Sequence, residues 1–298
     1  VRLLKQFMHS IGVYGAELKV GGFSGYLCEL LVLEYGSFRK VLEAAATWNR
    51  PVIDLEKHYG AHELQEKFDE PIIVVDPVDR KRNVAAAVSR TTLSKFIIGA
   101  QSMLKRPSEE KLFPKKASGE KELLKRAIKE RRTEVVGLVF RPPKIVPDVL
   151  WPQLKRSVNN ISKHLQMNGF RLISNEFWSD EKKRCALLFE LEVHALPKVV
   201  KVQGPKVHFD RQVESFVKKH RKSAHKIWVE GSRIVALEKR KFDDAASLIR
   251  YISKSPENYG IPEKMHRHIR SAKLARGAAL LKLVPLEVMH RFLLGEEL

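Results

Sequence analysis

Apolar residues at helical spacing predict three helices in the first fifty residues. Residues 1–10 carry leucine, phenylalanine and methionine three and four positions apart from the very start, without an N-cap or a leading loop. Ser24 and Ser37 each stand where an N-cap is expected, and they predict helices over residues 25–35 and 38–48. We therefore expect a helical first domain, and we expect the chain to be part of a longer protein.

The middle of the chain combines a short strand, a long helix and a charged boundary. Residues 71–77 form an apolar run that ends in Asp-Pro, which predicts a buried strand followed by a turn. Residues 84–104 predict a long helix. Residues 105–133 are rich in charge and contain prolines, and they predict a domain boundary with a short charged helix over residues 120–132.

The second part of the chain has the pattern of an α+β fold. The predicted order is strand, helix, strand, strand, helix, strand, over residues 135–140, 150–169, 170–177, 185–194, 210–221 and 227–237. The last of these stretches contains either a single strand or a hairpin around Gly231. That order is typical of a ferredoxin-like or RNA-recognition-type (RRM-like) β-α-β-β-α-β sandwich. The aromatic signature of the RNA-recognition sheet is missing, because Phe140 is the only aromatic residue of the first predicted strand.

From residue 243 onward the pattern is mostly helical and basic, and it ends with helical residues 272–293. These patterns predict three parts. They are a central helical domain over residues 1–110, the first part of an α+β domain over 111–200, and the remainder of that domain with a basic helical tail over 201–298.

The net charge of +20 lies almost wholly in the second part of the chain. Residues 1–110 hold 15 Lys and Arg against 14 Asp and Glu, whereas residues 111–298 hold 40 against 21. This asymmetry predicts a polyanionic partner, and the spread of basic residues through a folded region favours nucleic acid over a membrane surface. No apolar run reaches the ~18 residues of a membrane-spanning helix. Cys28 and Cys185 lie in apolar stretches, which predicts buried free thiols rather than a disulfide.

No complete active site is visible in the sequence. Asp76 and Asp79 follow a strand and could hold a metal, but the proline between them favours a turn. The glycines between residues 12 and 25 match neither a P-loop nor a dinucleotide-binding pattern, so turns and helix starts explain them. Ser24-Gly25 stays a candidate for phosphate binding at a helix start. We therefore predict no catalytic residue and no metal ligand in this chain.

Three further residues have both an ordinary and a functional interpretation. Lys5 on an apolar helix usually reaches outward to water, and Tyr14 between two glycines usually packs. Arg82 ends a run of three cations that is usually a solvated turn, although such a run after a strand can also hold phosphate. The residue patterns alone leave both interpretations open.

A series of motifs follows one another along the chain. They are Arg2–Lys5, Gly12–Glu17, Gly22–Leu30, Val75–Asp79, Lys81–Ala86, Phe140–Pro142, Trp151–Arg156 and Gly204–Pro205. In this order they resemble the central and C-terminal domains of the archaeal (class I) CCA-adding tRNA nucleotidyltransferases, and the resemblance weakens after about residue 240. That family builds the 3′-terminal CCA of tRNA from CTP and ATP without a nucleic-acid template. The resemblance implies that this chain supplies tRNA binding and part of the nucleotide pocket.

The resemblance also implies roles for individual residues. Lys5 and Tyr14 match residues that contact the triphosphate of the incoming nucleotide, a task suited to an ammonium and a phenol donor. Arg82 matches an arginine that helps to read the base together with the RNA backbone, and Arg156 matches a position near the acceptor stem. The family's catalytic carboxylates, with their Mg²⁺, belong to an N-terminal nucleotidyltransferase domain that is expected to be missing here. The chain alone is therefore expected to be inactive.

The basic second part fits the RNA partner that the resemblance implies. The family's C-terminal region binds the acceptor and TΨC arms of tRNA, and an A-form stem is recognised through its shape, phosphates and 2′-OH groups. The candidate contacts lie along the predicted helix 210–221 and just after it, with residues 211, 218 and 222 expected near one face. They are Arg211, Lys218, Lys219, Arg221 and Lys222. A merely solvated basic face is the alternative.

Two other functions stay open. One is a stand-alone, non-catalytic RNA-binding protein that descends from the same family. The other is a generic DNA-binding protein, which is less favoured because no helix-turn-helix or zinc pattern is present. The resemblance implies a cytoplasmic protein with tRNA, ATP and CTP as partners, and it leaves a homodimer open.

Overall fold

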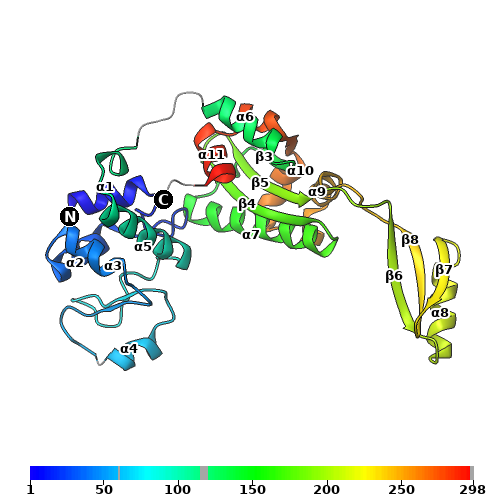
Figure 1. The fold of residues 1–298 in the computed structure, drawn as a ribbon, viewed down its shortest axis with the longest axis horizontal. Helices are drawn as coiled ribbons and strands as arrows, with labels where there is room; N and C mark the ends of the chain where they lie inside the picture. The colour runs from blue at the N-terminus through cyan, green and yellow to red at the C-terminus, as the bar shows by residue number, and fades with distance from the viewer. Residues whose placement is uncertain (60, 115–119, 296–298) are drawn as a thin grey trace. The chain divides into compact units, whose positions relative to one another are not determined.

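The computed structural model describes residues 1–59, 61–114 and 120–295, which form two compact units (Figure 1). Unit 1 is formed by the described residues of Val1–Glu120 together with Leu294 and Gly295, and unit 2 is Lys121–Leu293. Helices and strands are both present, which confirms the predicted α+β class. Among the described residues, no helix is both long enough and apolar enough to cross a bilayer.

Unit 1 is mostly helical, with one pair of short parallel strands in which Val52 lies opposite Ile73. In its core, Phe96 packs against Phe7 and Phe23, with ring centroids 6.3 and 4.9 Å apart. The elements are α1 (Arg2–Ser10), α2 (Gly25–Tyr35), α3 (Phe38–Ala45), β1 (Val52–Ile53), α4 (Ala61–Lys67), β2 (Ile73–Val74), α5 (Arg90–Lys105) and the 3₁₀ helix η1 (Glu109–Lys111).

Serine N-caps start α2 and α3 as predicted. The hydroxyl of Ser24 accepts from the backbone N–H of Leu27 at 3.0 Å, and that of Ser37 accepts from Lys40 at 3.2 Å. Gly36 ends α2 with a φ of 81°, the left-handed conformation that glycine adopts without strain. These local cues confirm the predicted bounds of α2.

The helix predicted over residues 84–104 begins later, at Arg90. The backbone N–H of Val84 donates to the carbonyl of Val74 at 2.8 Å, so the chain is still paired with β2 at this point. The hydroxyl of Ser89 then accepts a backbone N–H at 3.1 Å and caps α5. The backbone pairing of Val84 with Val74 therefore delays the start of the helix to Arg90. The pattern of apolar residues does not indicate this pairing.

Two other predicted elements are shorter in the structure. The helix predicted over 38–48 ends at Ala45, before the point where Trp48 turns inward and packs against Phe96, with ring centroids 5.7 Å apart. The strand predicted over 71–77 is restricted to β2, because its partner β1 is only two residues long. The turn predicted after it is confirmed by the side chain of Asp76, which accepts the backbone N–H two residues on at 3.0 Å.

Unit 2 contains two separate antiparallel sheets (Figure 1). The larger has the strand order β4-β5-β3-β9, and the smaller has the order β6-β8-β7. The elements are α6 (Glu120–Glu130), β3 (Glu134–Phe140), α7 (Pro147–Met167), β4 (Arg171–Ser179), β5 (Cys185–Val193), β6 (Val199–Lys206), α8 (Asp210–His220), β7 (Ala224–Glu230), β8 (Arg233–Lys239), α9 (Ala245–Lys254), η2 (Pro256–Tyr259), α10 (Glu263–Arg270), β9 (Lys273–Arg276), η3 (Gly277–Lys282) and α11 (Leu286–Leu294).

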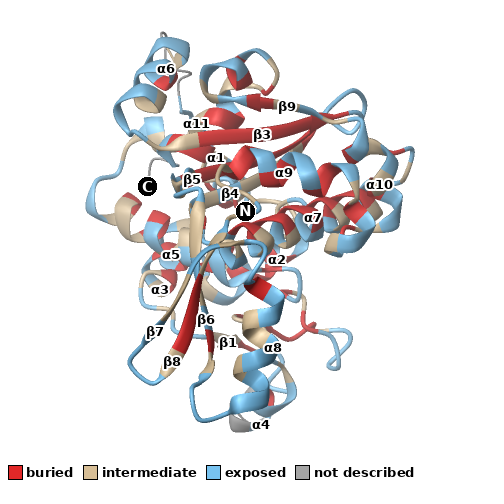
Figure 2. Cartoon of the chain, turned by 90° about the vertical axis from the view of Figure 1, so that its right-hand side faces the viewer, coloured by how far each residue is buried: buried red, intermediate tan, exposed pale blue. Residues whose placement is uncertain are grey.

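The larger sheet lies between two apolar layers. Successive residues of a strand face opposite sides of a sheet. Accordingly, Leu187 of β5 belongs to the layer formed with α7, α9 and α10, and Leu188 belongs to the layer formed with α6 and α11. Figure 2 shows β3 and β5 buried over most of their length. This two-sided burial makes the sheet the structural centre of unit 2.

The larger sheet has the strand arrangement of the predicted ferredoxin-like sandwich, but its last helix and strand are not the predicted ones. The sheet is completed by β9, after α9 and α10. The helix predicted over 210–221 and the strand predicted over 227–237 belong instead to the smaller sheet, which is inserted between β5 and α9. β9 escapes prediction because it is only four residues long, with Ala275 as its one buried residue.

The residues predicted to form a basic helical tail are part of the core, and the prediction of a tail is wrong. The helices α9 and α10 contribute Leu248, Ile252, Met265 and Ile269 to the layer that packs with α7. The continuous helical stretch expected over residues 272–293 is also wrong, because β9 and η3 precede α11. The apolar spacing in this region reflects packing against the sheet.

The smaller sheet is covered on one face by α8. A Cβ built on Gly204 would lie 3.0 Å from the ring of Phe216, so the helix approaches β6 closely at this glycine. At the end of α8, Nδ1 of His220 lies 2.7 Å from a carboxylate oxygen of Glu238 on β8. The hairpin predicted around Gly231 is confirmed by the pairing of β7 with β8, whereas β6 was not predicted.

Candidate functional site

The first candidate side chain, Lys5, lies on α1 and points toward α2. Its side chain is 28% exposed, and Nζ lies 2.8 Å from a carboxylate oxygen of Glu29 on α2. The hydrogen bond with Glu29 raises the pKa of Lys5 above its ordinary value, so the ammonium is charged at neutral pH. Lys5 is therefore held against α2 rather than extended into solvent.

Tyr14 lies in the loop between α1 and α2, whose path is fixed by backbone hydrogen bonds. The N–H of Phe23 donates to the carbonyl of Val13, and the N–H of Gly15 donates to the carbonyl of Phe23, both at 2.8 Å. Gly15 has a φ of +124°, which other residues rarely adopt. A Cβ on Gly22 would lie 2.1 Å from the carbonyl oxygen of Val13. The glycines thus allow the close backbone approach that places Tyr14.

Lys5 and Tyr14 converge on Gly25, the first residue of α2. A Cβ built on Gly25 would lie 3.1 Å from Oη of Tyr14 and 3.3 Å from Nζ of Lys5. The first N–H groups of a helix have no partner within the helix, and the helix dipole makes this end positive. An ammonium, a phenol and a helix N-terminus therefore meet at one point. This combination can bind an anion such as phosphate.

Arg82 lies next to a buried carboxylate, that of Asp76. The side chain of Asp76 is 6% exposed, and its Oδ2 lies 3.4 Å from Nη1 of Arg82, whose side chain is 63% exposed. The hydroxyl of Tyr26 on α2 donates to Oδ1 of Asp76 at 3.3 Å. The backbone N–H of Val78 donates to the same carboxylate and holds the pKa of Asp76 below its ordinary value. The ionised carboxylate thus orients Arg82, whose guanidinium carries further donors.

The helix α2 joins these two groups of residues. Its residues Gly25 and Glu29 adjoin the lysine, and Tyr26 reaches the buried aspartate. The structure thus brings together the two residues expected to contact a triphosphate. It places Arg82 beside Asp76, the carboxylate that Tyr26 of the same helix contacts. Tyr26 and Glu29 were not predicted. The spacing of four residues from Gly25 to Glu29, about one helical turn, is the signal that could have indicated Glu29.

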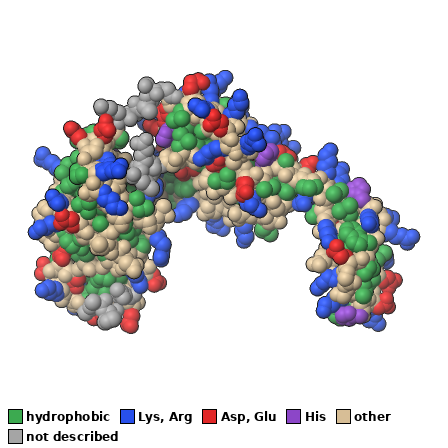
Figure 3. Space-filling model, viewed as in Figure 1, with side chains coloured by type: hydrophobic (Ala, Val, Ile, Leu, Met, Phe, Trp, Pro, Cys, Tyr) green, Lys and Arg blue, Asp and Glu red, His purple; other side chains and the backbone are tan. Residues whose placement is uncertain are grey.

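The predicted RNA-binding residues are all exposed, and they lie on two elements of unit 2. They are Arg156 on α7, and Arg211, Lys218, Lys219, Arg221 and Lys222 on and just after α8. Because α8 ends at His220, Lys222 lies beyond the helix, and the predicted common face applies to Arg211 and Lys218 alone. Figure 3 shows Lys and Arg side chains spread over the visible face of unit 2 rather than gathered in one patch.

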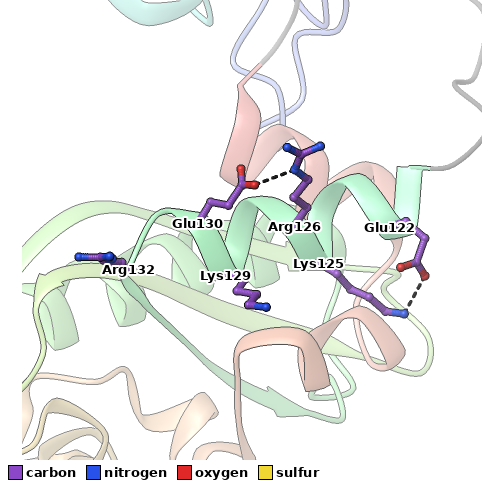
Figure 4. Close-up of a pocket in the computed structure, with 6 residues that line it drawn as sticks. All are labelled: Glu122, Lys125, Arg126, Lys129, Glu130 and Arg132. Carbon is purple, nitrogen blue, oxygen red and sulfur yellow. Dashed lines mark hydrogen bonds and ion pairs between the residues drawn. The ribbon is translucent and has the colours of Figure 1, made fainter.

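An open pocket lies on the surface of α6 and contains none of the predicted site residues (Figure 4). Within it, Lys125 pairs with Glu122, and Arg126 pairs with Glu130, each at 2.7 Å. Six charged residues line it: Glu122, Lys125, Arg126, Lys129, Glu130 and Arg132. Two of its four cations pair with carboxylates of the same exposed helix, and the pocket is open to solvent, so we assign no ligand to it.

Within residues 1–59, 61–114 and 120–295, no three His, Cys, Asp or Glu side chains gather as a metal site would require. Both cysteines are buried free thiols, as predicted. Burial raises the pKa of Cys28 to about 12 and that of Cys185 to about 11. Both thiols are therefore protonated at neutral pH, which makes them poor nucleophiles.

Comparison with known proteins gives matches over most of the chain. Residues 1–113 match the family described as tRNA nucleotidyltransferase, second domain, and residues 131–274 match the CCA-adding enzyme, C-terminal domain. The chain is 38% identical over 279 residues to the CCA-adding enzyme of Methanothermobacter thermautotrophicus, a match that covers 93% of this chain and 58% of the relative.

Two further relatives give similar values. The chain is 40% identical over 255 residues to the CCA-adding enzyme of Saccharolobus shibatae, covering 83% of this chain and 56% of the relative. It is 41% identical over 251 residues to that of Pyrobaculum neutrophilum, covering 84% and 57%. The chain thus spans a little over half the length of the curated relatives that it matches.

Proposed function

The chain belongs to the CCA-adding enzyme family across both matched domains, and we propose that it forms the central and C-terminal part of an enzyme that adds the 3′-terminal CCA to tRNA from CTP and ATP. In this proposal the chain supplies tRNA binding and part of the nucleotide pocket. The catalytic carboxylates belong to a nucleotidyltransferase domain outside residues 1–298, so the chain alone does not catalyse the addition. We place the enzyme in the cytoplasm.

The observation that carries the proposal is the meeting of Lys5 and Tyr14 at Gly25. A triphosphate offers several charged oxygens, and an ammonium, a phenol and a helix N-terminus are all donors to such oxygens. The ammonium of Lys5 has three donors, so its bond to Glu29 leaves others for phosphate. These features support unit 1 as the part of the enzyme that holds the triphosphate of CTP or ATP.

Arg82 is proposed to contact the base and the RNA backbone. Its Nη1 pairs with a carboxylate oxygen of the buried Asp76, which holds one edge of the guanidinium. The planar fork of an arginine can donate to a base edge and to a phosphate at the same time. The high exposure of Arg82 supports a role for its outer edge in such contacts.

Unit 2 is proposed to bind the acceptor and TΨC arms of tRNA. Recognition of an A-form stem depends on shape and on phosphate and 2′-OH contacts, for which distributed cations are suited. The exposed basic residues of α8 and Arg156 on α7 are the proposed contacts, and the charge excess of residues 111–298 supports them. Binding of this kind weakens steeply as salt is added.

The described residues do not fit a magnesium site, because no cluster of three metal-binding side chains is present among them. We therefore assign no Mg²⁺ ligand to these residues. Where the reaction uses Mg²⁺, we propose that the nucleotidyltransferase domain holds it.

The test restores the proposed enzyme from its two parts. This chain is combined with the nucleotidyltransferase domain of the Methanothermobacter thermautotrophicus relative, in trans and as a fusion, and incorporation of labelled CTP and ATP into tRNA lacking CCA is followed. We expect incorporation only when both parts are present. Lys5→Ala should raise the KM for CTP about tenfold, the effect of losing about 1.4 kcal/mol. Lys40→Ala, at an exposed position of α3, is the matched control and should leave it unchanged.

A stand-alone RNA-binding protein is the second candidate, although the comparisons do not favour it. It predicts salt-sensitive tRNA binding with no incorporation of CTP or ATP in either arrangement, and that result would refute the proposed enzyme. Competition between tRNA lacking CCA and duplex DNA of equal charge separates both candidates from a generic DNA-binding protein. Equal competition by the DNA would count against any tRNA-specific role.

A further inference from the structure

The ring of His9 stacks on the ring of Tyr14. The ring centroids are 5.1 Å apart, and the planes are inclined by 27°. His9 lies four residues after Lys5 on α1, so both side chains leave the same face of this helix. One face of α1 therefore supplies the lysine at the anion site and a support for the tyrosine at the same site.

The ring of Tyr14 is partly buried against the core of unit 1, and the imidazole of His9 is a further contact, stacked on that ring. Backbone hydrogen bonds fix the loop at Val13 and Gly15 on either side of it, but they do not fix the side-chain rotamers of Tyr14. In the part of the chain that the structure describes, no protein hydrogen bond to Oη of Tyr14 is recorded. The stacked imidazole is thus a contact that sets the plane of the ring, and with it the position of Oη beside Gly25.

We propose that His9 is a positioning residue, which holds the phenol of Tyr14 where it donates to a phosphate oxygen beside the ammonium of Lys5. This inference rests on the proposed function, because it assumes that the anion at Gly25 is the triphosphate of a nucleotide. His9 acts through the face of its ring. Its charge is not required, so another flat aromatic ring at this position can replace it.

Stacked aromatic pairs contribute about 0.5–1.5 kcal/mol beyond the area they bury, which corresponds to a change of about threefold to tenfold in a dissociation constant. That range is the expected effect of removing the imidazole on binding of the anion. His9 is exposed, so its removal should leave the thermal midpoint of unfolding unchanged within about 1 °C. A loss of binding without a loss of stability is the expected signature.

The experiment measures binding of inorganic tripolyphosphate and of CTP to the full chain by isothermal titration calorimetry. We expect His9→Ala to bind tripolyphosphate about threefold to tenfold more weakly, and His9→Phe to bind within twofold of the unmodified chain. In the Tyr14→Phe background, which lacks the hydroxyl, His9→Ala should cause no further weakening. Lys40→Ala is the matched control for the loss of a positive charge elsewhere on unit 1.

The outcomes separate this inference from the function on which it rests. If the unmodified chain binds no tripolyphosphate, or if Lys5→Ala binds it as tightly, the proposed anion site is wrong and the inference falls with it. If Lys5→Ala weakens binding but His9→Ala does not, the site stands and the inference is refuted. Failure of His9→Phe to restore binding would also overturn it, because the imidazole would then act through its charge. Equal weakening by His9→Ala with and without the Tyr14 hydroxyl would show that His9 acts independently of that hydroxyl, which refutes positioning.

Discussion

Replacing Gly25 by alanine tests the geometry of the anion site with a single methyl group. The new Cβ would lie 3.1 Å from Oη of Tyr14 and 3.3 Å from Nζ of Lys5, which is closer than a relaxed contact. Both atoms end flexible side chains, so they can withdraw by a few tenths of an ångström. Their withdrawal moves both proposed phosphate donors, and the methyl group occupies the space between them.

The effects of this substitution on folding nearly cancel, whereas its effect on binding does not. Alanine is favoured over glycine in a helix by up to about 1 kcal/mol, and the displaced side chains oppose this by a similar amount. We therefore expect the free energy of unfolding to change by less than about 1 kcal/mol. Loss of one charge-assisted hydrogen bond to the anion weakens binding by about 1.5–3 kcal/mol, which is roughly tenfold to a hundredfold in Kd.

Urea unfolding and calorimetric titration with tripolyphosphate measure these two quantities on the same protein. Leu33→Ala serves as the control, because Leu33 lies on the same helix and is 70% exposed, so it should leave the Kd unchanged. The reasoning is refuted if Gly25→Ala binds tripolyphosphate as tightly as the unmodified chain, since the methyl group would then not touch the anion.

Two further predictions concern unit 2. The carboxylate of Glu190 is 2% exposed and accepts two hydrogen bonds from Arg131, at 2.8 and 3.1 Å. Arg131→Ala leaves this buried charge unpaired, so it should lower the free energy of unfolding, measured in urea, by about 2–3 kcal/mol. A loss below about 0.5 kcal/mol would contradict this prediction. The hydrogen bond to His220 holds the pKa of Glu238 in the folded protein below its ordinary value. The ionised carboxylate therefore stabilises the folded state in full above pH ~4.3, and this contribution is lost as the pH falls through the lowered folded-state pKa. Glu238→Gln should therefore flatten the decline in thermal midpoint below pH ~4.3, measured by circular dichroism between pH 7 and 3, and an unchanged decline would count against the argument.

The parts of the fold that the sequence predicts well are those with local causes. The serine that caps α2 and the glycine that ends it act within one helical turn, so a short window of sequence contains the whole signal. The start of α5 has a distant cause, since Val84 is held by the carbonyl of Val74. Apolar periodicity carries no information about such pairing, and the predicted helix is therefore too long at that end.

The same distinction explains the strands of unit 2. The pattern over residues 210–237 correctly predicts a helix and a hairpin, but it does not say which sheet they join. β9 supplies the missing strand of the larger sheet with only four residues, too few to show an alternation. The candidate site follows this rule as well. The resemblance of the motifs at residues 2–5 and 12–17 indicates Lys5 and Tyr14, whereas the partnership of Tyr26 with Asp76 depends on a contact across 50 residues.

The smaller sheet joins the larger domain through two chain segments that lie side by side. The N–H of Leu196 donates to the carbonyl of Asp243 at 2.8 Å, and the N–H of Ala245 donates to the carbonyl of His194 at 2.9 Å. These bonds hold together the two ends of the inserted segment, which runs from residue 196 to residue 243. The entropic cost of closing such a segment rises only slowly with its length. The module that carries α8 can therefore lengthen, shrink or be exchanged during evolution without altering the register of β5 or the start of α9. A surface attached in this way can change while the fold that supports it stays constant.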